Sequence, residues 1–322
     1  MWMKGELILA VQNQVKSFSV QDLIMEKKKK RKLFSAEKVM PIVLLLTAIA
    51  SVLTTIGILF TLLFETFTFF DRVSIAEFLT AEKWYPFSEP GTFGIMALVS
   101  GTLRVTLIAI IVAVPLGIGT AIYLSEYASD KNRRMIKPIM EVLAGIPTIV
   151  YGFFALTFVT PILREFIPSL EIFNALSPGI VIGIMITPSI ASLSEDAMSS
   201  VPRTMREGAL AMGSTKFETA VKVVLPAAMS GIIASIVLGI SRAIGETMIV
   251  AVAGGSTPNL GWDVTGSIQT MTAYIVQVSQ GDAGYGTTIY YSIYAVGFTL
   301  FMFTLIMNLL AQFITRRFKE EY

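Results

Sequence analysis

The sequence predicts an all-α polytopic membrane protein with six transmembrane helices. The chain of 322 residues is 54% hydrophobic and only 15% charged, whereas soluble globular domains average about 25% charged residues. Its apolar residues gather in six runs, each long enough or nearly long enough to cross roughly 30 Å of hydrocarbon. Lysine and arginine concentrate in alternate connections between these runs. This distribution is typical of a chain that crosses a membrane repeatedly.

The fourth predicted span is the shortest of the six, and its run PGIVIGIMITPSIASLS mixes glycine, proline and serine with apolar residues. Packed transmembrane helices often have this composition. The fifth span is predicted to be one continuous helix. The six predicted spans cover residues 41–64, 95–123, 143–162, 177–193, 227–253 and 289–314.

Basic residues predict the orientation of the chain. Twenty Lys and Arg fall on the side that holds both termini, including the run KKKKRK, and three fall on the opposite side. By the positive-inside rule, both termini are cytoplasmic in a multi-pass protein of the plasma (inner) membrane. KKKKRK is interpreted as a topology anchor, with no nucleic-acid partner. The predicted parts are a cytoplasmic N-terminal tail (1–39), a first transmembrane helix with an extracytoplasmic loop (40–94), a core (95–315) and a cytoplasmic C-terminal tail (316–322).

Several classes of protein are excluded by what the sequence lacks. Cysteine and histidine are both absent, which rules out disulfides, thiolate or imidazole metal sites and nucleophile–histidine catalysis. No Gly-Lys-Ser/Thr sequence is present, so the chain does not bind ATP through a P-loop. We therefore expect no catalytic residue, no metal and no cofactor on this chain, and the protein is not predicted to be an enzyme.

The cytoplasmic connection at 196–228 has the pattern of two short helices. Gly213 suits the left-handed end of the first. Thr215 and Glu218 have the spacing of a capping box for the second, which Pro226 ends. Two such helices joined at a glycine form a rigid knob that can transmit force between a soluble partner and the spans. A DNA-binding helix-turn-helix is disfavoured because the second helix is not basic enough, while an ordinary loop helix remains open.

This connection resembles the EAA loop of ABC-importer permeases, whose pattern is Glu-Ala-Ala, three residues, Gly, nine residues, Ile, one residue and Leu-Pro. Two positions differ from the pattern: Gly208 replaces the first alanine and Val223 replaces the isoleucine. The resemblance covers roughly residues 95–315 and implies a type I permease core whose loop docks into a groove of the ATPase subunit. The implied ATPase-coupling residues are Glu207, Gly208, Ala209, Gly213, Leu225 and Pro226.

Two charged residues, Arg242 and Glu246, lie inside the predicted fifth span. Each costs roughly 2.5–3.5 kcal/mol at a bilayer centre, so both need a reason to be there. On a continuous helix they lie one turn apart on one face. They either neutralise each other inside the bundle or line a transport path. A guanidinium offers a fork of N–H donors that matches a tetrahedral oxyanion, and a nearby carboxylate can hold that fork in position.

The stretch SRAIGETM around these residues resembles the fifth-span signature of phosphate-importer permeases, in the form carried by the PstC-type subunit. Sulfate and molybdate permeases carry Phe-Gly after the glutamate, so Thr247 and Met248 favour phosphate. The run AGIPTIVYGFFAL resembles the third span of the same permeases. The resemblance implies that Arg242, Glu246 and Thr247 line the substrate path.

The resemblance also implies the function and the partners of the chain. It would form half of the translocation path of an ATP-driven phosphate importer in the lipid bilayer, with a second, PstA-type permease subunit, a dimer of PstB-type ATPases that use ATP and Mg, and an extracytoplasmic PstS-type phosphate-binding protein. The connection at 255–286 has no Lys or Arg and an amphipathic stretch near 268–278; it either faces that binding protein or is a connector only. The alternatives are a sulfate- or molybdate-type permease, and a passive anion channel or secondary carrier.

Overall fold

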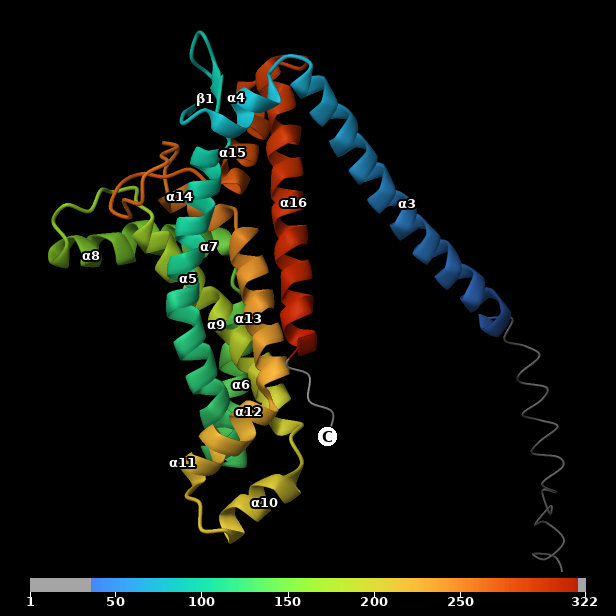
Figure 1. Ribbon diagram of the computed structural model, residues 1–322, viewed down its shortest axis with the longest axis vertical. Coiled ribbons are helices and arrows are strands. Elements are labelled where there is room, and N and C mark those ends of the chain that lie inside the picture. The colour runs from blue at the N-terminus through green and yellow to red at the C-terminus, as the bar shows by residue number, and fades with distance from the viewer. Residues whose placement is uncertain (1–35, 318–322) are drawn as a thin grey trace, which may run out of the picture. The chain divides into compact units, whose positions relative to one another are not determined.

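The computed structural model describes residues 36–317, and almost all of its regular structure is helical (Figure 1). The prediction of an all-α fold is confirmed, apart from one small hairpin of antiparallel strands β1 (Trp84–Tyr85) and β2 (Thr92–Phe93). The helices are α3 (Ala36–Phe70), α4 (Ile75–Thr80), α5 (Met96–Ile122), α6 (Asp130–Gly145), α7 (Thr148–Phe154), α8 (Thr160–Phe166), α9 (Leu176–Ser199), α10 (Arg203–Ala211), α11 (Lys216–Thr219), α12 (Leu225–Ala227), α13 (Met229–Ile244), α14 (Met248–Ala253), α15 (Met271–Gln277) and α16 (Thr288–Arg317), with π-helical segments η1 (Tyr123–Tyr127), η2 (Ala155–Val159), η3 (Ala220–Val224) and η4 (Val278–Asp282).

Five helical segments of the described chain are long and apolar enough to cross a membrane, and they confirm five of the six predicted spans. A sixth arises only if two helices that meet at an angle of 73°, Lys216–Ala227 and Met229–Ile244, are counted as one span. The third span begins later than predicted because Pro147, in an extended conformation, separates α6 from α7. The five segments are Val39–Phe70, Met96–Tyr127, Thr148–Phe166, Leu176–Ser199 and Thr288–Thr315.

The chain divides into two units, residues 1–61 and residues 62–322. The described part of the first unit is the N-terminal portion of α3, which belongs to the candidate span Val39–Phe70. The basic run KKKKRK, interpreted as a topology anchor, lies outside the described residues. The second unit holds the remaining helices and every site discussed below.

The centre of the second unit is the packing of α9 against α5 and α13 (Figure 1). Ile182, Ile186 and Ile190 of α9 are completely buried in this core. Gly183 lets α5 approach closely, because a Cβ atom there would lie 2.8 Å from the carbonyl oxygen of Ala109. These helices therefore form a densely packed wall that positions the side chains of α13.

At one end of the second unit, aromatic side chains pack edge to face around the hairpin. Trp84 is 1% exposed, and its ring centroid lies 5.7 Å from that of Phe93 and 5.0 Å from that of Tyr274. Tyr274 in turn shares a hydrogen bond of 2.6 Å with the hydroxyl of Ser292 on α16. The hairpin is thus fixed to α15 and α16, at the end opposite α10 and α11 (Figure 1).

Candidate functional site

The predicted fifth span is broken at the residues expected to line the path. Helix α13 ends at Ile244 and α14 begins at Met248, so residues 245–247 form a connection. At its other end, α13 is separated from α12 by the bend at Ala228. The prediction of one continuous helix over 227–253 is therefore wrong. Glycine has a low helix propensity, so Gly245 favours a break at this point. The side chain of the next residue, Glu246, accepts hydrogen bonds from the first backbone N–H groups of α14.

The carboxylate of Glu246 caps α14. Its Oε1 atom accepts hydrogen bonds from the backbone N–H groups of Met248 (3.0 Å) and Ile249 (3.3 Å), and the residue is 8% exposed. A helix N-terminus has unpaired N–H groups and a partial positive charge, both of which an acidic side chain satisfies. The backbone oxygen of Glu246 also accepts a bond of 2.8 Å from the hydroxyl of Thr272. The side chain and the backbone oxygen of Glu246 thus both help to fix the conformation of the connection at residues 245–247.

The guanidinium of Arg242 lies in the last turn of α13 and is exposed. Its Nη1 donates a hydrogen bond of 2.9 Å to the Oγ of Ser189 on α9. Within residues 36–317 neither an ion pair nor a hydrogen bond joins Arg242 to Glu246, and Arg242 has no carboxylate partner. The prediction that the two charges lie one turn apart on one helical face is wrong, and mutual neutralisation does not explain them. Most N–H donors of the fork remain available.

Thr247 lies in the same connection and is half-buried, where its hydroxyl donates to the carbonyl oxygen of Gly245 at 3.1 Å. The three predicted path residues lie within six positions of the chain and differ in their contacts. Arg242 is available to a ligand, whereas Glu246 and Thr247 hold the local backbone.

A cavity of about 410 Å³ lies beside the contact between Arg242 and Ser189. Sequence reasoning missed the residues around it. Among them, Lys137 of α6 lies 2.7 Å from the carboxylate of Glu195, which is completely buried and also pairs with Arg133. The lining residues are Lys137, Met140, Glu141, Ala144, Pro188, Ser189, Ser192, Leu193, Asp196 and Leu238.

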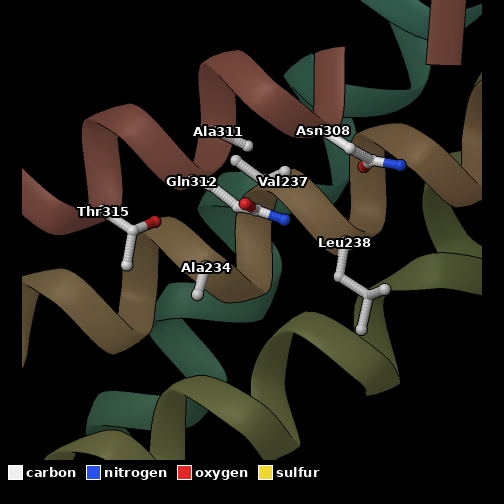
Figure 2. Close-up of a pocket in the computed structure, with 7 residues that line it drawn as sticks. All are labelled: Ala234, Val237, Leu238, Asn308, Ala311, Gln312 and Thr315. Atoms are coloured by element: carbon white, nitrogen blue, oxygen red, sulfur yellow. The ribbon is translucent and has the colours of Figure 1, made fainter. Parts of the chain in front are cut away.

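A second hollow, of about 480 Å³, lies between α13 and α16 (Figure 2). Polar side chains of Asn308, Gln312 and Thr315 reach it from α16, opposite the small apolar residues Ala234 and Val237 of α13. None of its lining residues is charged, so it offers an anion no opposite charge. We therefore place the candidate anion site at Arg242, which bonds Ser189 of α9.

The predicted knob is present. Helix α10 carries Glu207, Gly208 and Ala209, and a glycine with φ 91° follows it, as predicted for Gly213. The capping box that opens α11 is confirmed by both of its reciprocal bonds, which join Thr215 and Glu218. Leu225 and Pro226 lie on α12, at the foot of the knob.

An ion pair that the sequence did not reveal fixes the knob to the bundle. Arg206 of α10 lies 3.1 Å from the carboxylate of Glu126 in η1, and both side chains are largely buried. The same guanidinium donates to the carbonyl oxygens of Met198 (2.7 Å) and Val201 (2.6 Å), at the end of α9. Met212 remains 88% exposed. The knob is thus rigidly attached and presents an apolar side chain outward.

A buried arginine, Arg104, organises the end of the second unit that lies opposite the knob. Arg104 of α5 is 1% exposed and donates to the backbone carbonyl oxygens of Asp263 (2.6 Å) and Asn259. Hydrogen bonds from the hydroxyl and the N–H of Thr265 hold the pKa of the Asp263 carboxyl below its usual range. An arginine inside an apolar run was the available signal, the same one that marked Arg242. Its role here is to fix the connection after α14.

The connection at 255–286 is folded against the bundle. Its predicted amphipathic stretch near 268–278 corresponds to α15, whose residues Met271 to Tyr274 are buried. Trp262 is 67% exposed, whereas Gln269 is 3% exposed. The connection therefore has exposed surface around Trp262 and around Tyr285, which is 84% exposed.

Comparisons with known proteins agree on one family. Residues 113–320 match the model of the family described as "Binding-protein-dependent transport system inner membrane component". The chain is 34% identical over 252 residues to the "Probable ABC transporter permease protein YqgH" of Bacillus subtilis, covering 77% of this chain and 80% of that protein. It is 32% identical over 259 residues to the "Phosphate transport system permease protein PstC" of Mesorhizobium japonicum, covering 74% and 78%. The resemblance to PstC-type permeases is thereby confirmed.

Solved structures show the same fold at low sequence identity. A bacterial alginate ABC transporter, in complex with a periplasmic protein that holds an alginate pentasaccharide, matches with a TM-score of 0.59 and 16% identity, covering 90% of this chain and 96% of that chain. The inward-facing MetNI methionine ABC transporter matches with a TM-score of 0.52 and 18% identity, covering 70% and 95%. The predicted type I permease core is confirmed.

Proposed function

Because the chain belongs to the family of binding-protein-dependent transport system inner membrane components, we propose that it is a permease subunit of an ATP-driven importer of inorganic phosphate. In this proposal it forms half of the translocation path and couples to the ATPase through the knob at 196–228. It is a transport subunit, and ATP with Mg is used by the partner ATPase.

One observation carries the assignment of the path. Arg242 lies in the last turn of α13 without a carboxylate partner among the described residues, and one N–H of its guanidinium donates to the hydroxyl of Ser189. A guanidinium whose remaining N–H groups are unused matches a tetrahedral oxyanion in charge and in geometry. Relatives named as phosphate transport permeases favour phosphate as that oxyanion. Weak retention by a single arginine suits a step in which the anion must also leave.

The knob supplies the coupling surface in this proposal. Gly213 allows a tight turn between α10 and α11, and Met212 and Phe217 beside it are 88% and 65% exposed. Apolar side chains on a rigid projection are suited to a groove in a soluble partner. The positive-inside distribution favours a cytoplasmic position for the knob and for both termini. The proposed partners are an ATPase dimer of the PstB type, a PstA-type permease and an extracytoplasmic PstS-type binding protein.

The test is labelled phosphate uptake by vesicles that hold the chain with its candidate ATPase, permease and binding-protein partners. The proposal expects uptake that needs ATP and that excess unlabelled phosphate, and not sulfate, abolishes. Uptake of sulfate or molybdate in place of phosphate would assign the chain to that type of permease. Phosphate flux without ATP or the ATPase would identify a passive channel or secondary carrier.

A further inference from the structure

Helix α6 has an apolar face that points away from the bundle. The helix packs against α9 through the side that carries Arg133, whose guanidinium pairs with the buried carboxylate of Glu195. Met135, Ile139 and Val142 are 59%, 58% and 69% exposed. Because about 3.6 residues complete one helical turn, these three side chains share one face, on the side of the helix opposite Arg133. We call this side the outward face of α6.

Two cations stand at the N-terminal end of the outward face. Lys131 and Arg134 are exposed, and within residues 36–317 neither forms an ion pair or a side-chain hydrogen bond. They are three residues apart, so they are neighbours on the helix surface. Asp130 is the first residue of α6, a position at which a carboxylate interacts favourably with the helix N-terminus. The next carboxylate of the helix, Glu141, lies about two turns beyond Arg134.

The other charges around this end of α6 are paired with one another. Arg133 and Lys137 share the carboxylate of Glu195, and Glu126 of η1 pairs with Arg206 of the knob. Apart from the Glu126–Arg206 pair, four cations face three carboxylates, namely Lys131, Arg133, Arg134 and Lys137 against Asp130, Glu195 and Asp196. The excess of positive charge therefore lies on the outward face, at the two cations without a partner.

Tyrosine side chains lie beside these cations. Tyr123 and Tyr127 of η1 are 40% and 45% exposed, and Asn132 of α6 donates from its Nδ2 to the hydroxyl of Tyr123 at 3.1 Å. Tyrosine rings are enriched at the headgroup level of a membrane, and long cationic side chains reach the same level. The rise from Lys131 to Val142 is about 16 Å, close to half of a hydrocarbon core of roughly 30 Å. The outward face thus changes along the helix as a bilayer leaflet changes from headgroups to acyl chains.

We propose that the outward face of α6 binds an anionic phospholipid, with Lys131 and Arg134 on the headgroup phosphate and Met135, Ile139 and Val142 on the acyl chains. The guanidinium fork bonds two phosphate oxygens, and the ammonium adds a second charge. A phosphatidylcholine headgroup brings its own cation, which these residues repel, whereas an anionic headgroup attracts them. The competing occupant is the second permease subunit. The graded order of cations, tyrosines and apolar side chains along one helix favours the lipid.

The absence of cysteine from this sequence allows a fluorescent probe at a single position of the chain. Val142→Cys is labelled with an environment-sensitive fluorophore, and the assembled complex is reconstituted into phosphatidylcholine vesicles. Dibrominated phosphatidylglycerol should quench the probe several-fold more than an equal fraction of dibrominated phosphatidylcholine. Ile139→Cys replaces Val142→Cys if the latter does not assemble. The complex with the cysteine-free parent chain gives the background of labelling.

A matched control position lies on α3. Ile58 is 63% exposed, and the sequence from 39 to 71 around it holds no Lys or Arg. A probe at Ile58→Cys should be quenched equally by the two brominated lipids, because no cation selects an anionic headgroup there.

The two cations are tested in the same assay. In the background Lys131→Gln, Arg134→Gln, the preference for phosphatidylglycerol should disappear while quenching by phosphatidylcholine remains. The charge-matched background Lys83→Gln, Arg164→Gln removes two exposed cations outside α6 and should keep the preference.

Three results would overturn the proposal. Absence of quenching by either lipid would show that protein covers the outward face. Equal quenching by both lipids at Val142→Cys would show acyl contact without an anionic headgroup site. A preference that survives the loss of Lys131 and Arg134 would assign it to other cations. The readout is lipid contact and not transport, so each result is independent of the proposed import of phosphate.

Discussion

Arg242 and Glu246 should behave as independent residues, because each has a different partner. Arg242→Gln removes the bond to Ser189, worth about 0.5–1.5 kcal/mol for a typical hydrogen bond. Glu246→Gln keeps an acceptor oxygen for Met248 and Ile249 but removes the negative charge from the N-terminus of α14. Such a charge contributes about 0.3–1 kcal/mol near a helix terminus, and up to about 2 kcal/mol where it is partly buried. The two losses should simply add in the double variant.

The assay is a double-mutant cycle on the stability of the purified complex, measured from denaturant midpoints of the parent, the two single variants and the double variant. Independent sites add within about 0.3–0.5 kcal/mol. The matched control is the cycle of Arg242→Gln with Ser189→Ala, two residues in contact, where a coupling of roughly 0.5–1.5 kcal/mol is expected. A favourable coupling of about 1 kcal/mol or more between Arg242 and Glu246 would refute the independent roles and restore the ion pair.

Three further outcomes follow from the two ends of the bundle. Gly213→Asp should leave the chain in the membrane but abolish substrate-stimulated ATP hydrolysis. The φ of 91° costs a non-glycine residue about 1–2 kcal/mol, and the new charge enters the proposed docking surface. Normal stimulation of ATP hydrolysis in the reconstituted complex would contradict this prediction. Arg206→Met should lower the stability of the complex by roughly 1.5–3 kcal/mol, and Arg206→Met with Glu126→Gln by less than the sum of the single losses; full additivity contradicts the ion pair. A photo-crosslinker at Trp262 should capture the binding protein and one at the buried Gln269 should not; the reverse result, or no capture at Trp262, leaves this connection as a connector only.

Features set by local patterns could be predicted from the sequence. Apolar run length located five spans, because a helix that crosses hydrocarbon needs a minimum length whatever it packs against. The capping box at Thr215 and the left-handed Gly213 depend on residues within a few positions of each other. Their chemistry is therefore visible without any knowledge of the tertiary fold.

Features that depend on competing local contacts or on distant partners could not be predicted from the sequence. The run at 227–253 is mainly apolar, so it predicts a continuous helix, whereas the structure breaks it at Gly245 and the side chain of Glu246 caps the next helix. Arg206 finds Glu126 eighty positions away, and Arg104 finds carbonyl groups of a connection more than 150 positions away. The sequence shows that these positions carry arginine, but it does not show the partner that determines the role of each one.

The central claim is that Arg242 meets phosphate during transport, and labelled phosphate uptake per assembled complex tests it most directly. The account predicts severe loss in Arg242→Gln and in Arg242→Lys, because an ammonium keeps the charge but lacks the planar fork. It predicts a milder loss in Glu246→Gln, which keeps the cap of α14, and no recovery in the Arg242→Gln, Glu246→Gln double variant. Near-normal uptake by that double variant would contradict the claim.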